Sequence, residues 1–192
     1  MSAIMTREQA LALLQEHVRT DTLVKHCLAT EAIMRSLARR LQQDEHLWGL
    51  VGLLHDLDFE TTREDSASHG RKSEEILRAK AATHPFPEEG IQAILGHNAE
   101  NLGIPRTSVF DKAITAAETV TGLIVATALV QPDKKAASVK LKSVTKRLKE
   151  KAFARNVSRE RIALCEEIGI PAEEFVALSL SAMQGAAAEL GL

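Results

Sequence analysis

The stretch "GLLHDLDFE", residues 52–60, places one histidine and two aspartates at the end of a run that is otherwise apolar. In the preceding stretch "LWGLVGLL" the apolar side chains fall on every side of a helix, which is typical of a segment enclosed by other elements. A buried ionised carboxylate is costly, so it protonates, pairs with a cation or binds a metal. His55 and Asp56 therefore mark a candidate centre for chemistry.

Two more polar residues lie in apolar helical patterns. His26 is at the margin of the apolar stripe of its helix, and Glu118 is the only charged residue between positions 113 and 131. Each also has a structural interpretation, His26 as a core histidine with one hydrogen bond and Glu118 as a buried carboxylate paired with a Lys or Arg. Together with His55 and Asp56 they supply two imidazoles and two carboxylates, which is the ligand inventory of a divalent metal site.

Three further residues could extend this site. His69, in "SHGRKSEEIL", and His97, in "ILGHN", could hold a second ion, although a histidine with no role is the alternative for each. Asp58 could orient a water molecule or support a ligand from behind, and a helix-capping role would explain it equally well. No function is predicted for the remaining histidines, which are His17, His46 and His84.

A basic segment, "KLKSVTKRLKEKAFAR" at 140–155, holds seven Lys or Arg residues and a single acid, Glu150. One interpretation is a solvated helix face. The other is a set of side chains that bind a phosphate at the mouth of the site, with a serine donating a hydrogen bond. In this second interpretation the substrate-binding residues are drawn from Lys140, Lys142, Ser143, Lys146 and Arg147.

The elements that must position these residues are predicted to be helices throughout. Tyrosine is absent, and Ala, Leu, Glu and Arg recur at spacings of three and four residues, so we expect an all-α fold. Start signals such as the capping-box pattern "TREQ" at 6–9 divide the chain into successive helices. We expect the first helix to end near Val18, and later helices to span Asp21 to about Leu41, Asp44 through His55, and Pro87 to about His97. A further helix should begin near Ser73, another should cover about 108–130, and the last two should begin at Ser158 and Pro171.

Length and composition predict one helical domain over residues 1–192, because no linker separates two halves. A net charge of −2 and few aromatic residues argue against a nucleic-acid partner. The purely apolar part of residues 113–131 is too short to cross a bilayer, and the first residues do not resemble a secretory signal. Cys27 and Cys165 are expected to be buried thiols, so we expect a cytoplasmic protein without a membrane partner.

The order of these motifs resembles the HD superfamily of metal-dependent phosphohydrolases, most closely its small stand-alone proteins of the HDIG type. The resemblance is carried by His26, "LLHD" at 53–56, "HGRKSEEIL" at 69–77, "IQAILGHN" at 91–98 and "KAITAAETVTGLI" at 112–124. It covers about residues 20–130 and implies an orthogonal bundle of helices, which residues 134–192 extend.

The resemblance also implies roles for individual residues. His26 matches the first metal ligand of the family, and His55 and Asp56 match its HD pair. His69 and His97 match the additional histidines of members that bind two metals, and Glu118 stands where the family usually has Asp, so it is expected to be a metal ligand too.

The sequence departs from the family at three other points. Phe59 replaces a frequent lysine, so a positive charge near the phosphate is missing there. Asn98 replaces the second of two successive histidines, and "GIP" at 103–105 is only a fragment of the signature of cyclic dinucleotide phosphodiesterases, which disfavours that subclass.

The expected function is hydrolysis of a phosphate ester by a metal-activated water, on a small phosphorylated substrate that is a phosphomonoester, a phosphodiester or a nucleotide. The expected cofactor is one or two divalent ions, chosen from Mn, Co, Ni, Fe, Mg and Zn. The alternative is a metal- or nucleotide-binding regulatory module without catalysis. The sequence leaves open whether the chain forms a homo-oligomer.

Overall fold

The computed structural model describes residues 4–191, and within this range the regular elements are helices, with no strand, as the sequence predicts. The helices are α1 (Arg7–His17), α2 (Asp21–Leu41), α3 (Glu45–Leu54), α4 (Phe59–Thr62), α5 (Arg71–Lys80), α6 (Glu88–His97), α7 (Ala99–Leu102), α8 (Val109–Leu129), the 3-10 turn η1 (Ala136–Ser138), α9 (Leu141–Lys149), α10 (Arg159–Glu167), α11 (Ala172–Gly185) and α12 (Ala187–Leu190).

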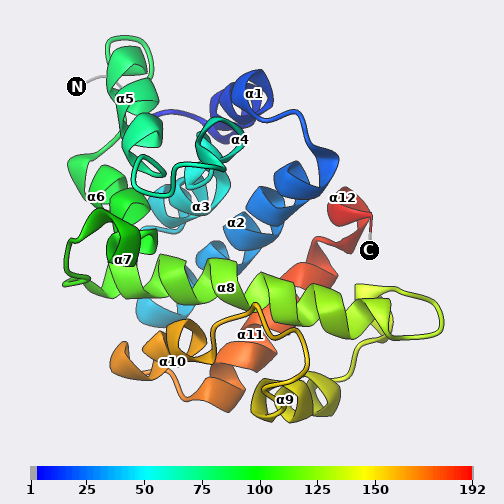
Figure 1. The fold of residues 1–192 in the computed structure, drawn as a ribbon. Helices are drawn as coiled ribbons and strands as arrows, with labels where there is room; N and C mark the ends of the chain where they lie inside the picture. The colour runs from blue at the N-terminus through cyan, green and yellow to red at the C-terminus, as the bar shows by residue number, and fades with distance from the viewer. Residues whose placement is uncertain (1–3, 192) are drawn as a thin grey trace.

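Helix α8 runs across the middle of the molecule (Figure 1). The helices α1 and α3 to α6 lie on one side of it, and α9 and α10 lie on the other. Helix α2 packs against α3, α8 and α11, so α2 and α8 contact both the first half and the last third of the chain. Contrary to the expectation from the sequence, α8 is long and apolar enough, by length and composition alone, to cross a membrane, but 67% of its most apolar window is buried inside the protein, as in a central core helix.

Side-chain caps set several of the predicted helix starts. The Thr6 side chain forms a capping box at α1, Ser108 forms another at α8, and Asp44 accepts hydrogen bonds from the first turn of α3. The single-turn helices α4, α7 and α12 and the turn η1 were not predicted, because four residues or fewer carry no recognisable periodicity.

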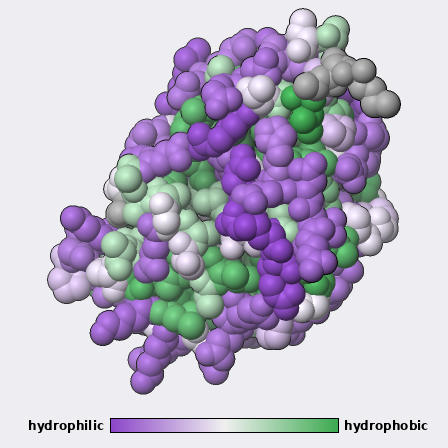
Figure 2. Space-filling view, turned by 180° about the vertical axis from the view of Figure 1, so that it is seen from behind, coloured by the Kyte–Doolittle hydropathy of each residue, from purple (hydrophilic) through white to green (hydrophobic). Residues whose placement is uncertain are grey.

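The surface seen from behind is mostly hydrophilic, with apolar residues between the polar ones (Figure 2). The large hydrophobic side chains that are exposed among the described residues are Val109, Leu129 and Val130, at the two ends of α8. The middle of α8 is therefore buried, while its ends reach the surface.

A close approach of α2 and α3 depends on Gly52. A Cβ atom at this position would lie 2.8 Å from the backbone oxygen of Thr30 and 2.9 Å from the Cα of Glu31. Real Cβ atoms do not approach backbone atoms this closely, so only glycine allows the two helices to pack at this distance. This contact brings the end of α3 next to His26 on α2.

We expect Gly52→Ala to lower the free energy of unfolding by about 1–3 kcal/mol, because the added methyl group overpacks the α2–α3 contact. Gly185→Ala is the matched control, since a Cβ at this helical glycine would meet nothing within 4 Å. The control should be neutral or raise stability by up to about 1 kcal/mol. Denaturant unfolding of the two variants measures the difference, and equal stabilities would contradict the packing argument.

Candidate metal centre

His55 and Asp56 lie where α3 ends, in the interior of the protein. The His55 ring is buried, and its Nδ1 donates a hydrogen bond to the carbonyl oxygen of Gly52 at 2.9 Å. This bond places the ring proton on Nδ1, so Nε2 carries a lone pair. The last turn of the helix thus sets the tautomer of His55.

His26 approaches His55 from α2. Its Nδ1 lies 3.0 Å from the hydroxyl oxygen of Thr121 on α8, and that hydroxyl donates its own proton to the carbonyl oxygen of Glu118. The Thr121 oxygen therefore accepts from His26, which leaves the His26 Nε2 with a lone pair. The two Nε2 atoms of His26 and His55 are 3.2 Å apart.

A second pair of imidazoles lies beside the first. His97 is the last residue of α6, and its Nδ1 donates to the carbonyl oxygen of Ile94. His69 is in the loop before α5, and its Nδ1 lies 2.8 Å from the carboxylate of Asp58. The Nε2 atoms of His69 and His97 are 2.9 Å apart.

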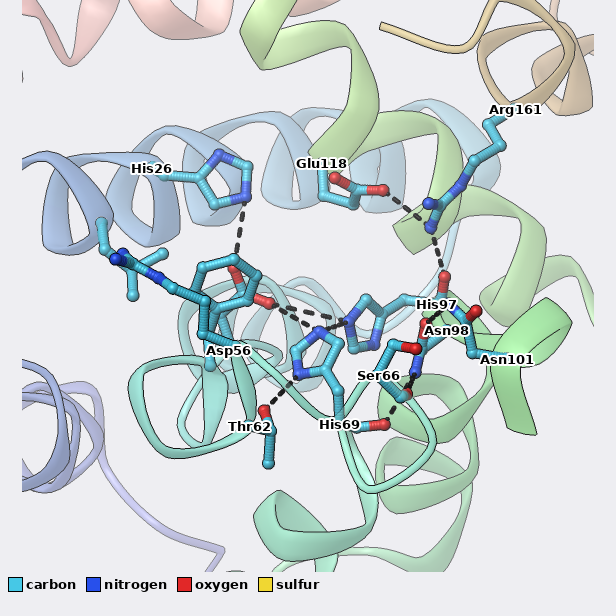
Figure 3. Close-up of a pocket in the computed structure, with 13 residues that line it drawn as sticks. His26, Asp56, Thr62, Ser66, His69, His97, Asn98, Asn101, Glu118 and Arg161 are labelled. Atoms are coloured by element: carbon cyan, nitrogen blue, oxygen red, sulfur yellow. Dashed lines mark hydrogen bonds and ion pairs between the residues drawn. The ribbon is translucent and has the colours of Figure 1, made fainter. Parts of the chain in front are cut away.

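The carboxylate of Asp56 lies between the two pairs, and Figure 3 shows it beside His26, His69 and His97. Its Oδ2 is 3.7 Å from His26 Nε2 and 3.6 Å from His55 Nε2. Its Oδ1 is 3.3 Å from His69 Nε2 and 3.6 Å from His97 Nε2. In each of the two resulting groups the three ligand atoms lie within 4.8 Å of one another, and Asp56 belongs to both.

This donor set fits a pair of divalent cations. In each group two imidazole nitrogens face each other with their Nδ1 atoms already engaged, so either a shared proton or a metal ion must relieve the repulsion of their lone pairs. Two ligand atoms that each lie about 2.1 Å from one ion are separated by about 3 Å, close to the spacing within both pairs. Imidazole and carboxylate are ligands that divalent first-row metals accept.

The charges of the groups in the centre depend on their burial and on the neighbouring side chains. Burial lowers the pKa of His26 and of His55, which favours the neutral rings that can bind a metal. Burial alone would raise the pKa of Asp56, but the surrounding histidines, His55 foremost, hold it well below its usual range. Burial opposes protonation of His69 as well, yet hydrogen bonds to Asp56 and Asp58 raise its pKa to about 9.

Asp58 supports the centre from behind. One carboxylate oxygen accepts from His69, and the other accepts from the backbone N–H groups of Gly70 at 2.7 Å and Ser73 at 3.0 Å. The residue is buried, and it is not among the described residues that line the pocket. Asp58 thus combines the two interpretations offered by the sequence, since it caps the start of α5 and positions His69.

A pocket of about 470 Å³ opens onto the centre. It exposes His26, Asp56, His69 and His97 to the outside, while His55 lies behind them. Glu118 and Arg161 line one part of the pocket, and Phe59 and Arg63 line another. A pocket of this size accommodates a small-molecule substrate.

Glu118 lines the pocket but does not converge with the other expected ligands. Its carboxylate lies 2.9 Å from Nη2 of Arg161, and it belongs to neither ligand group found among residues 4–191. The side chain of Glu118 is only 17% exposed, so a cation partner offsets part of the cost of burying it. In this structure Glu118 matches its alternative interpretation, a buried carboxylate paired with an arginine, and its role as a metal ligand stays a prediction.

The basic segment at 140–155 is placed away from this pocket. None of Lys140, Lys142, Ser143, Lys146 and Arg147 is among the described residues that line it. Helix α9, which carries most of these residues, follows the end of α8 and packs against α8 and α11. Lys142 and Lys146 line a separate hollow, which agrees with the other interpretation, a solvated helix face.

The pocket contains two cations that the sequence did not single out. The guanidinium of Arg63 lies 6.0 Å from the centre of the Phe59 ring, so this side of the pocket has a positive charge despite the missing lysine. Arg161 comes from α10, and no motif marks it. The isolated Glu118 indicated that some cation would lie nearby, but periodicity could not identify which one.

The HD domain family model matches residues 23–128. The chain belongs to the HD domain family. HD domains are typically metal-dependent hydrolases that bind divalent ions, and the matched segment contains both ligand groups. It ends before α10, which supplies Arg161. Comparison with curated proteins gave no match, and comparison with solved structures gave none either.

We expect the metal-free protein to take up about two Mn²⁺ ions per chain, because both ligand groups share Asp56. His69→Ala should lower the plateau to about one ion, since it removes a ligand from one group only. Mass measurement during a metal titration gives the count. The control is His84→Ala, outside both groups, and a plateau of one ion in the unchanged protein would contradict the second group.

Binding of the second ion should depend on pH. His69 has a pKa of about 9, so below that pH an ion must displace the proton on its Nε2. The affinity of this ion should rise about tenfold per pH unit from pH 7 toward pH 9 and then level off. Calorimetry in buffers of different ionisation enthalpy would detect the released proton. A constant affinity across this range would show that His69 is already neutral.

Proposed function

We propose that this HD domain protein hydrolyses a small phosphate ester with water, using two divalent ions held by His26, His55, Asp56, His69 and His97. The observation that carries the proposal is the Asp56 carboxylate, which lies between two pairs of imidazole nitrogens whose other nitrogens are engaged in hydrogen bonds. Membership of the HD domain family supports it.

Some residues of the centre would hold the ions, and others orient the imidazole rings that bind them. Ions bound there would lower the pKa of water and withdraw charge from a phosphoryl oxygen. Asp56 would supply negative charge to both groups, and because the four imidazoles would bind as neutral ligands, the assembly would keep a net positive charge that attracts a phosphate dianion. The carbonyl of Gly52, the hydroxyl of Thr121 and the carboxylate of Asp58 fix the ring orientations, so little reorganisation is needed when ions bind.

The pocket favours a small anionic substrate. Arg63 and Arg161 place positive charge at its wall, and a volume of about 470 Å³ suits a phosphomonoester or phosphodiester of the size of a nucleotide. Cys27 and Cys165 are free buried thiols, which fits the reducing cytoplasm that we propose as the compartment.

The test is a screen of metal-loaded protein against nitrophenyl phosphate mono- and diesters and nucleoside monophosphates, with Mn, Co, Ni, Fe, Mg and Zn. Asp56→Ala should lower turnover by at least about a hundredfold, because several kcal/mol of charge stabilisation by the ions is lost with their shared ligand. Asp133→Ala, an exposed carboxylate in the turn after α8, is the control.

Full turnover in Asp56→Ala would exclude hydrolysis at this centre. Two bound ions in the unchanged protein without hydrolysis of any of these esters would favour the other function, a metal- or nucleotide-binding regulatory module.

A further inference from the structure

The wall of the pocket is completed by a residue from outside the matched HD segment. Arg161 belongs to α10, which packs against α8. Its side chain is 30% exposed and lines the same pocket as His26, Asp56, His69 and His97. The C-terminal helices thus contribute directly to the metal-centre pocket.

Two acceptors hold the guanidinium of Arg161 in place (Figure 3). Its Nη2 lies 2.9 Å from Oε1 of Glu118 and also donates to the backbone carbonyl oxygen of His97. The same His97 supplies Nε2 to one ligand group, so Arg161 is tied to the frame of the metal centre. Its position relative to the ions is therefore set by α6 and α8 together.

The contacts of Arg161 leave donors unused. Both contacts involve Nη2, and Nε is buried without a hydrogen-bond partner among the described residues. Among the described residues Nη1 also has no hydrogen-bond partner, so on this partly exposed side chain it remains the donor for an acceptor in the pocket. A phosphate has several charged oxygens, and the planar guanidinium can donate to two of them at once.

The pairing also accounts for glutamate at position 118. The extra methylene group of Glu, relative to Asp, extends the carboxylate by more than about 1 Å. Here the carboxylate contacts Arg161 and the hydroxyl of Thr119, at 2.7 Å, and not the ligand groups. A role as metal ligand would require Glu118 to leave the arginine unpaired in a largely buried position.

We propose that Arg161 binds a non-bridging oxygen of the substrate phosphate, and that Glu118 is the residue that positions Arg161 and not a metal ligand. This inference rests on the proposed function, because it assumes that a phosphate enters the pocket. It adds a specificity element that depends on the C-terminal helices, since the arginine comes from α10.

The probe for the experiment is inorganic phosphate, measured by calorimetry on the Mn²⁺-loaded full chain. Arg161→Gln should weaken phosphate binding about tenfold or more, as expected for the loss of a charge-assisted hydrogen bond. Glu118→Gln should weaken it less, because the arginine remains but is no longer fixed by a charge. Arg161→Lys should restore part of the affinity, since a lysine keeps the charge without the planar fork.

Metal content is the readout that separates positioning from ligation. All of these variants should bind as many ions as the unchanged protein, and thermal unfolding checks that each is folded. The matched control is Arg155→Gln, an exposed arginine in the turn before α10 that is not among the described residues lining the pocket. It should bind phosphate and metal normally.

Loss of an ion in Glu118→Gln would overturn the inference by showing that Glu118 is a ligand. Undiminished phosphate binding in Arg161→Gln would overturn it while leaving the proposed function intact. If the unchanged protein takes up metal but binds no phosphate, both the inference and the proposed function fail.

Discussion

Four imidazole rings surround the buried carboxylate of Asp56, and the surrounding structure is organised around this contact. The rings come from α2, the end of α3, the loop before α5 and the end of α6, so most of the first half of the chain must pack correctly for them to meet. A carboxylate in such a place would be costly without cations, and the histidines hold its pKa well below the usual range.

The precision of the centre comes from the residues that contact the rings from behind. Two of the four Nδ1 atoms donate to carbonyl oxygens at helix ends, one to a hydroxyl of α8 and one to the carboxylate of Asp58. Because helix ends have carbonyl groups without partners in the helix, His55 and His97 use acceptors that the fold provides at no added cost. The local structure thus selects the tautomer in which Nε2 can bind a cation.

Much of this arrangement could be predicted from the sequence because it depends on local signals. Capping residues and apolar periodicity located the long helices to within a few residues, and isolated polar residues in apolar helices marked His26, Asp56 and Glu118. The partner of Glu118 could not be predicted, since the contact of α10 with α8 joins distant parts of the chain. Charge density left two interpretations of the basic segment open, because a cluster of lysines does not reveal which way its helix faces.

The most direct test of the account is an X-ray absorption measurement on Mn²⁺-loaded protein, because the central claim is that one carboxylate joins two ions. A carboxylate shared by both groups predicts imidazole nitrogen in the ligand shell and a metal–metal distance of about 3.5–4 Å, lost in Asp56→Ala. Two bound ions without a short metal–metal distance, or the same distance in the variant, would contradict the account.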